Sequence, residues 1–319
     1  MLTFNQVWEV FENIRRAQMH GKYSPHKPLL ILLALSRIQK GLPRQANFTE
    51  IDAPLKGLLT EFGPSSAAKS RHYPFWHLAT DAQGGLWEIS GPSELLTRPA
   101  GLTPNLSELR DPQVKAGFSE PIYQALKYTP GLLESLAQHI LLAYFSSTIT
   151  DDIAATLGLS LEPIVAASVS ETLPVPYLPE SRKKRDPGFR ERVLRAYEFR
   201  CCICGFDLRI GSMSAGLEAG HIQWHMNGGP DIETNGLALC ALHHKLFDLG
   251  VFTLEPYEHR VVFSQHAVGG NRNLDGELRH HGSKMLSPQQ TDQKPAPEFL
   301  EWNLNNIFKK PARQIVKEP

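Results

Sequence analysis

Four potential metal ligands lie in two short motifs in the last third of the chain. Cys201 and Cys204 form a C-x-x-C pair, and Cys240 and His243 form a C-x-x-H pair. A turn of this spacing lets both side chains of a pair point at one ion, and Zn²⁺ prefers four such sulfur and nitrogen ligands in a tetrahedron. Cys202 competes with Cys201, but its spacing to Cys204 is too short for the usual knuckle. The motifs therefore predict a structural zinc site, with buried free thiols as the alternative interpretation.

Three further polar residues accompany these motifs in an order that suits phosphodiester hydrolysis. We expect His221 at the end of a short strand, Asn235 before a second strand or helix, and His244 in a helix over residues 239–248. The reaction needs a base that takes a proton from water and a divalent cation that neutralises charge developing on the phosphate. Because imidazole titrates near neutrality, His221 is the candidate base.

This β-β-α segment inside its zinc motifs resembles the HNH nucleases of the ββα-metal fold. The resemblance implies that His221 is the general base and that His244 binds the catalytic ion, which would be Mg²⁺ or Mn²⁺. It also implies that Asn235 orients its neighbours or coordinates the same ion. In this family Phe-Asp follows the helical histidine, as Phe247 and Asp248 do here.

One position departs from the family pattern. Many members carry Asp or His directly before the base as a second metal ligand, and this chain carries Gly220 there. Asp248 lies one helical turn beyond His244 on the same face, so it is the candidate second ligand for the catalytic ion. The alternative is that this carboxylate only fixes the end of the helix. His225 and Glu218 are weaker candidates.

The remaining elements predict an α+β chain of two domains. We expect a mainly helical recognition domain with a small β-hairpin over residues 1–160, a Pro-rich basic linker over 161–186, and the HNH domain over 187–310. Alternation around a Gly-Gly turn places the hairpin at 75–89, and the polar stretch 267–296 predicts a loop. Apolar spacing predicts helices over 27–39, 48–62, 119–128, 130–145, 188–198 and 297–308.

Two segments of the first domain, KYSPHKPLLILLALSR and SRHYPFWHL, carry a second resemblance. They are similar to the sulfur-binding domain found ahead of HNH domains in type IV restriction enzymes that cut phosphorothioate-modified DNA. A non-bridging sulfur is less hydrated than oxygen, so its pocket should combine apolar surface with cations that hold the adjoining phosphates. Three clusters offer both: Arg71, His72, Tyr73 and Pro74; Tyr23, His26 and Lys27; and Thr97, Arg98, Pro99 and Ala100. The alternative is that Tyr73 and Pro74 pack in the core and the basic residues are solvated.

Charge and composition leave DNA binding open, and they argue against a membrane-spanning or a secreted protein. The 319 residues contain 33 Lys or Arg and 33 Asp or Glu, but residues 181–200 hold eight basic and three acidic side chains. The longest aliphatic run, Leu29 to Leu35, is far shorter than the roughly 20 residues that span a bilayer. The N-terminus does not resemble a secretory signal, and four clustered cysteines suit a metal site in a reducing cytoplasm.

The sequence therefore predicts a cytoplasmic DNA endonuclease of a restriction system. Its expected partner is double-stranded DNA, phosphorothioate-modified, and cleavage of both strands would suggest a homodimer. One alternative is an HNH restriction enzyme that reads methylated or unmodified DNA. Another is a non-catalytic zinc module that binds nucleic acid.

Overall fold

The computed structural model describes residues 2–12, 14, 24–99, 101–161 and 186–315. The described residues up to Leu161 belong to one compact unit, and those from Asp186 belong to a second. The linker predicted over 161–186 lies, apart from its two end residues, outside the described residues, as do Tyr23 and Ala100. Within the described residues, no helix has the length and apolar character needed to cross a membrane.

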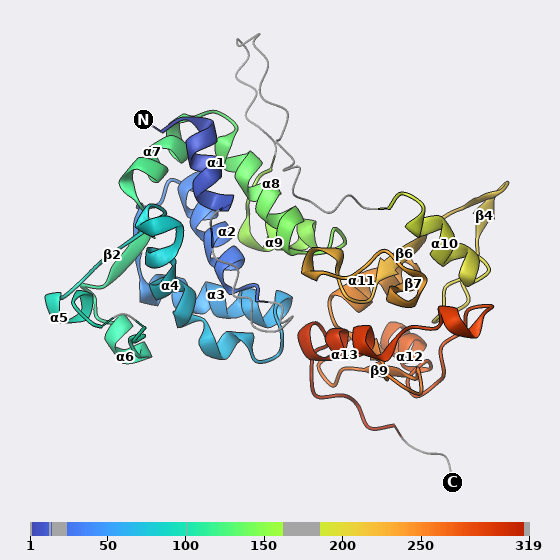
Figure 1. The fold of residues 1–319 in the computed structure, drawn as a ribbon. Coiled ribbons are helices and arrows are strands. Elements are labelled where there is room, and N and C mark those ends of the chain that lie inside the picture. Colours follow the sequence, from blue (N-terminus) through green and yellow to red (C-terminus); the bar gives the residue numbers. More distant parts are fainter. Residues whose placement is uncertain (1, 13, 15–23, 100, 162–185, 316–319) are drawn as a thin grey trace. The chain divides into compact units, whose positions relative to one another are not determined.

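The first unit is built around a helix that is buried along most of its length (Figure 1). This helix, α2 (His26–Gln39), packs against α3 (Phe48–Phe62), α4 (His72–His77) and α8 (Leu132–Tyr144). Leu29, Leu30, Leu32 and Leu35 are 0% exposed, so apolar burial on several sides of α2 accounts for its central place. The other helices of the unit are α1 (Phe4–Glu12), α5 (Ser93–Leu96), α6 (Leu106–Leu109), α7 (Glu120–Tyr128) and α9 (Thr150–Leu157).

A small antiparallel sheet replaces the predicted hairpin. Strand β3 (Lys115–Phe118) lies between β1 (Gln45–Asn47) and β2 (Trp87–Ser90). The prediction of a hairpin over 75–89 is wrong, because its first half forms α4 and a 3-10 helix, Leu78–Gly84. Phe75 and Leu78, three residues apart and both 0% exposed, share one face of a helix, whereas in a strand they would point to opposite faces. The Trp87 indole donates a hydrogen bond to the Phe75 carbonyl (3.0 Å), which joins the sheet to α4.

The second unit places a two-stranded hairpin between two helices. Strand β6 (Leu217–His221) pairs antiparallel with β7 (Gly236–Cys240), and α11 (Ala241–Asp248) follows without a break. Helix α10 (Phe189–Ala196) packs against both strands. This is the predicted β-β-α order.

Further elements enclose this centre. Strands β8 (Phe252–Leu254) and β9 (Val261–Phe263) form a second hairpin, and α13 (Pro297–Asn306) packs on β8. Strands β4 (Arg209–Ile210) and β5 (Met213–Ser214) form a short hairpin with largely exposed side chains. Helix α12 (Asn271–Leu278) corrects the prediction that 267–296 is a loop. Its polar composition gives little apolar periodicity, although it supplies a residue of the site described next.

Candidate active site and metal centre

The four predicted zinc ligands lie together in the second unit. The ligand atoms of Cys201, Cys204, Cys240 and His243 all lie within 4.8 Å of one another. The Nδ1 atom of His243 is 3.5 Å from Cys201 Sγ and 3.2 Å from Cys240 Sγ. Zinc bonds of about 2.3 Å to sulfur and about 2.0 Å to nitrogen give a tetrahedral edge of roughly 3.5 Å. The donor set and its spacing therefore fit a tetrahedral ion.

Local backbone structure and one distant carboxylate orient these ligands. The Cys201 amide donates to the Phe206 carbonyl (2.9 Å) and the Gly205 amide donates to the Cys201 carbonyl (2.9 Å), which closes the first knuckle. Glu277 of α12 lies 2.9 Å from His243 Nε2. A carboxylate on the second ring nitrogen fixes the tautomer that offers Nδ1 to a metal, an arrangement typical of zinc-binding histidines. The sequence prediction missed Glu277 because it looks like an ordinary exposed acidic residue.

His221, the candidate base, lies at the end of β6 opposite Gly236. Its ring stacks on Phe189 of α10, with 4.1 Å between ring centroids and 16° between planes. Its Nε2 atom is 2.7 Å from Asp231 Oδ1. The side chain is 14% exposed, so it reaches solvent while its orientation is held by two neighbours.

His244 lies between two carboxylates on α11 and β6. Its Nε2 atom is 3.4 Å from Asp248 Oδ2, and its Nδ1 atom is 2.6 Å from Glu218 Oε2. Burial lowers the pKa of His244, but the charges of Asp248 and Glu218 outweigh it and raise the pKa above its usual value. The hydrogen bond to His244 in turn holds the pKa of Glu218 below its ordinary value. Glu218 thus holds the Nδ1 side of the ring, which leaves Nε2 beside Asp248 Oδ2.

The packing of His244 explains why Gly220, directly before the base, departs from the family pattern. A Cβ atom added to Gly220 would lie 2.9 Å from both Cδ2 and Nε2 of His244. The imidazole therefore fills the space where the usual second ligand would begin. The Trp224 indole fixes the Asp248 carboxylate by donating a hydrogen bond to its Oδ1 atom (2.8 Å).

We predict that Gly220→Ala impairs cleavage without unfolding the nuclease unit. The added methyl group must displace a His244 ring that Glu218 and Asp248 hold. A misplacement of about 1 Å at a catalytic group costs on the order of 100-fold in rate. Cleavage rates measured over a range of Mg²⁺ or Mn²⁺ concentrations test the effect, and higher metal should recover part of it. Gly276→Ala in α12 is the matched control, since its added Cβ meets nothing within 4 Å; equal rates for both variants would contradict the prediction.

Asn235 uses its whole side-chain amide inside the protein. Its Oδ1 accepts from the Gln223 amide (2.8 Å), and its Nδ2 donates to the carbonyls of Gln223 and Pro230 (3.0 Å each). The residue is 0% exposed. These contacts close the loop between β6 and β7, which carries Asp231. They favour orientation of the loop over coordination of the catalytic ion, the two roles that the resemblance left open.

In the first unit, described residues of two of the three predicted sulfur-site clusters lie together around α4. His26 Nε2 is 2.9 Å from the Ala67 carbonyl, just before α4. Tyr73 is 46% exposed and its ring stacks between His72 and His77, with centroid distances of 4.5 and 5.9 Å. The Nε2 atom of His77 is 2.7 Å from Thr103 Oγ1, in the segment that follows the third cluster.

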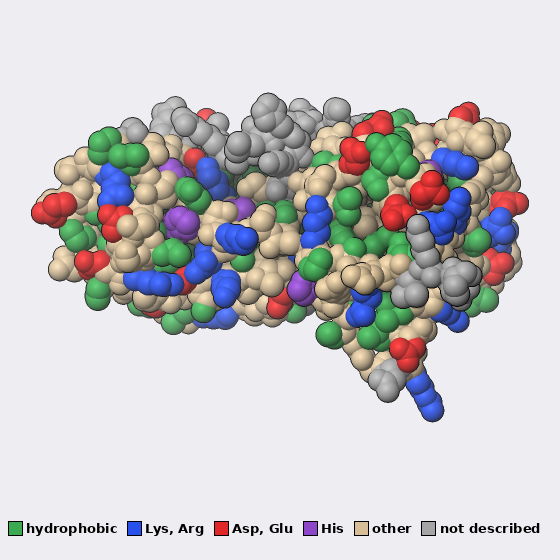
Figure 2. Space-filling view, turned by 90° about the horizontal axis from the view of Figure 1, so that it is seen from below, with side chains coloured by type: hydrophobic (Ala, Val, Ile, Leu, Met, Phe, Trp, Pro, Cys, Tyr) green, Lys and Arg blue, Asp and Glu red, His purple; other side chains and the backbone are tan. Residues whose placement is uncertain are grey.

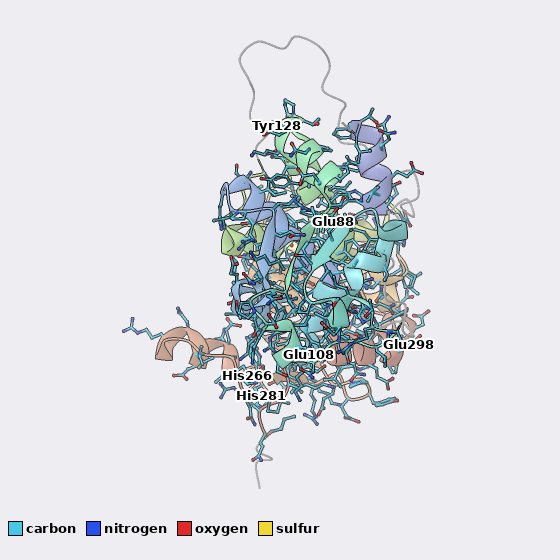
Figure 3. All side chains as sticks on the ribbon, turned by 90° about the vertical axis from the view of Figure 1, so that its left-hand side faces the viewer. Glu88, Glu108, Tyr128, His266, His281 and Glu298 are labelled. Atoms are coloured by element: carbon cyan, nitrogen blue, oxygen red, sulfur yellow. The ribbon has the colours of Figure 1, made fainter. Side chains whose placement is uncertain are left out.

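The cations of these clusters are paired with carboxylates. Lys27 lies 2.6 Å from buried Asp81, Arg71 pairs with Asp52, and Arg98 pairs with Glu108, which is labelled in Figure 3. Pro74 is buried, as the core interpretation expected, whereas Thr97 and Pro99 are exposed. Figure 2 shows basic and acidic side chains interspersed over the face that it draws. Recognition of a polyanion at α4 would therefore depend on local geometry and on the exchange of ion-pair partners.

Comparisons with protein families agree with both resemblances. Residues 4–162 match the ScoMcrA-like DNA sulfur-binding domain, and residues 201–255 match an HNH endonuclease family. No curated protein matches the chain.

Similar solved structures cover the first half of the chain. The sulfur-binding domain of ScoMcrA complexed with phosphorothioated DNA has 23% identity and a TM-score of 0.40, with 49% of this chain and 99% of that chain covered. The sulfur-binding domain of SprMcrA in a similar complex has 20% identity and a TM-score of 0.38, with 50% and 95% covered. The type IV phosphorothioation-dependent restriction endonuclease ScoMcrA has 23% identity and a TM-score of 0.38, with 48% and 28% covered.

The HNH family match spans the zinc ligands, His221, Asn235 and His244, while the other match contains all of α4 and its neighbours. The chain thus joins a ScoMcrA-like DNA sulfur-binding domain to an HNH endonuclease domain.

Proposed function

We propose that this protein is an endonuclease that binds phosphorothioate-modified DNA through its first unit and cleaves phosphodiester bonds with its second. The observation that carries the proposal is the arrangement on β6 and α11. A solvent-accessible histidine ends the strand, and on the helix His244 Nε2 and Asp248 Oδ2 lie 3.4 Å apart. A purely structural zinc module has no need of this second group.

The residues suggest a division of the chemistry. His221 takes a proton from water as the water oxygen bonds to phosphorus, and the bond from phosphorus to the leaving oxygen breaks. His244 Nε2 and Asp248 would hold a divalent cation, for which Mg²⁺ or Mn²⁺ suits the oxygen-rich surroundings. Such an ion, when bound, stabilises the charge on the phosphate and the leaving oxygen. A structural Zn²⁺ would be held by Cys201, Cys204, Cys240 and His243. Asn235 positions the loop between β6 and β7.

The surroundings of Tyr73 suit a less hydrated sulfur. Its half-exposed ring lies beside His72 and His77, so apolar surface adjoins polar groups. Burial and the neighbouring positive charges of Arg71 and Lys27 hold the pKa of His72 and His77, respectively, below the usual value, so both imidazoles stay neutral near pH 7. Neutral rings pack more easily against a weakly hydrated atom than charged ones do. The proposed partner is double-stranded DNA in the cytoplasm, and a homodimer would supply one active site for each strand.

Cleavage of matched plasmids tests the proposed function. We expect cleavage of phosphorothioate-containing plasmid with Mg²⁺ or Mn²⁺, little cleavage of the same plasmid without sulfur, and loss of this preference in Tyr73→Ala. Tyr128→Ala is a matched control, because this tyrosine is 56% exposed on α7 (Figure 3). Equal cleavage of both plasmids would favour an enzyme that reads methylated or unmodified DNA. Absence of cleavage with any divalent ion would favour the non-catalytic zinc module.

A further inference from the structure

A carboxylate that none of the motifs assigns lies against the candidate base. Asp231 Oδ1 is 2.7 Å from His221 Nε2, and the two side chains are only 12% and 14% exposed. Burial raises the pKa of Asp231, but the hydrogen bonds from the Asp186 amide and from His221 outweigh it and lower the pKa below its usual value. The group is therefore a carboxylate near neutral pH, and a carboxylate can only accept a hydrogen bond. Nε2 of a neutral His221 must then carry the proton, which places the lone pair on Nδ1.

Asp231 is itself held from two directions. The Asp186 amide donates to Oδ2 (2.7 Å), and the Arg192 guanidinium donates to the Asp231 carbonyl (2.9 Å). Arg192 also forms ion pairs with Asp186 (2.7 Å) and Glu233 (2.6 Å). The remaining neighbour is His225, whose Nε2 lies 3.8 Å from Oδ2. One carboxylate oxygen thus has a fixed backbone donor, while the other faces the base.

Helix α10 fixes the His221 ring as well as the backbone of Asp231. Phe189 stacks on the His221 imidazole, and Arg192, on the same helix, anchors Asp231. The helix lies so close to β7 that a Cβ on Gly236 would come within 2.4 Å of Val193 Cγ2. Because Gly236 is the strand partner of His221, this close contact leaves the base little freedom to move.

We propose that Asp231 is a positioning residue that keeps His221 in the Nε2–H tautomer, so that Nδ1 receives the proton of the attacking water. The inference rests on the proposed nuclease function and deepens it. A positioning role for Asp231 and a purely structural role predict different effects of an asparagine at this position. The Asp186 amide dictates how an asparagine at position 231 must lie: its oxygen accepts from that amide, and its NH₂ group faces His221. Nε2 must then become the acceptor, and the proton moves to Nδ1, which can no longer serve as a base.

The test compares two substitutions in the full chain. We expect Asp231→Asn to lower the cleavage rate by about 100-fold or more, since general-base catalysis contributes roughly 10²- to 10⁴-fold. Asp231→Ala should lower it less, because a histidine that has lost this carboxylate can still adopt either tautomer. A structural role predicts the opposite order, since asparagine preserves the shape of aspartate. Nitrogen-15 NMR of the histidine side chains should show the His221 proton on Nε2 in the wild type and on Nδ1 in Asp231→Asn.

Controls separate this inference from the proposed function. DNA binding and the unfolding temperature should be unchanged in Asp231→Asn, and neither substitution should lower the residual rate of a His221→Ala variant any further. Asp292→Asn, at an exposed position of the same unit, should behave as the wild type. If Asp231→Asn cleaves faster than Asp231→Ala, or keeps the Nε2–H tautomer, the inference fails while the nuclease function stands. If His221→Ala cleaves normally, the proposed catalytic site itself is wrong.

Discussion

His221→Ala should reduce cleavage of phosphorothioate DNA by about 10²- to 10⁴-fold, the usual contribution of a general base, while leaving DNA binding intact. The base lies on β6 of the nuclease unit, whereas the proposed sulfur site lies on α4 of the other unit. The substitution also removes a ring that is 14% exposed, stacks on Phe189 and lies 2.7 Å from Asp231, so it carries a cost in stability that the unfolding temperature measures. Single-turnover cleavage at saturating DNA isolates the chemical step from binding.

His266→Ala provides a control for the loss of an imidazole from the same unit. His266 is exposed, as labelled in Figure 3, and its Nε2 lies near the Lys310 carbonyl, which gives it no part in the proposed chemistry. We expect wild-type cleavage from this variant. Wild-type cleavage from His221→Ala, or an equal loss from both variants, would contradict the assignment of His221 as the base.

The parts of the site that could be predicted from the sequence are those set by local geometry. Cys201 and Cys204 meet because only two residues of a turn separate them. His243 and His244 point to different partners because adjacent helical residues face different directions. His243 accordingly reaches the cysteines and His244 reaches Glu218. The predicted helix over 48–62 matches α3 for a similar reason, since its buried residues recur at helical spacing.

The carboxylates that orient the histidines could not be predicted in this way. Glu218, Asp231 and Glu277 lie 26, 10 and 34 residues from the histidines that they contact. Each is brought there by a strand pair, a loop or a helix whose packing is not local. An isolated acidic residue in the sequence looks the same whether it faces solvent or a catalytic ring. For Glu218 the sequence did offer one signal, which is the glycine two residues further along the same strand. Gly220 makes room for the His244 ring, and Glu218 holds that ring.

Charge partners in the first unit show the same limit. The sequence presents Arg71, Lys27 and Arg98 as cations beside apolar residues, and the structure pairs each with a carboxylate. Asp52 is 19 residues from Arg71, and it also pairs with Arg110 at 2.9 Å. The proposed recognition of DNA at this surface would therefore depend on tertiary arrangement, and it would not require a net positive charge on the whole chain.

Loss of the proposed zinc cluster should have the largest effect on stability. Structural zinc in small domains contributes about 10–16 kcal/mol of apparent binding free energy, as much as or more than the 5–15 kcal/mol that stabilises a typical domain. The nuclease unit has its own apolar core around Phe247 and Phe252, so only part of this amount is lost. We expect Cys201→Ala, or a strong chelator, to unfold the nuclease unit at 37 °C while the first unit keeps its structure and DNA binding. Calorimetry and metal content of the full chain measure both effects.

Two variants make this prediction specific to the cluster. Cys202→Ala removes a neighbouring buried thiol that lies outside the ligand set, so zinc should be retained. The backbone amide of residue 202, which donates to the Ala238 carbonyl (2.8 Å), remains in this variant. Glu277→Gln should retain the fold but weaken zinc binding by about 10- to 100-fold, because the carboxylate that orients His243 is lost. Asp275→Asn, exposed on the same helix, controls for the change in charge. Zinc loss from Cys202→Ala with retention in Cys201→Ala would reverse the ligand assignment, since only one of the two adjacent thiols can complete the tetrahedron.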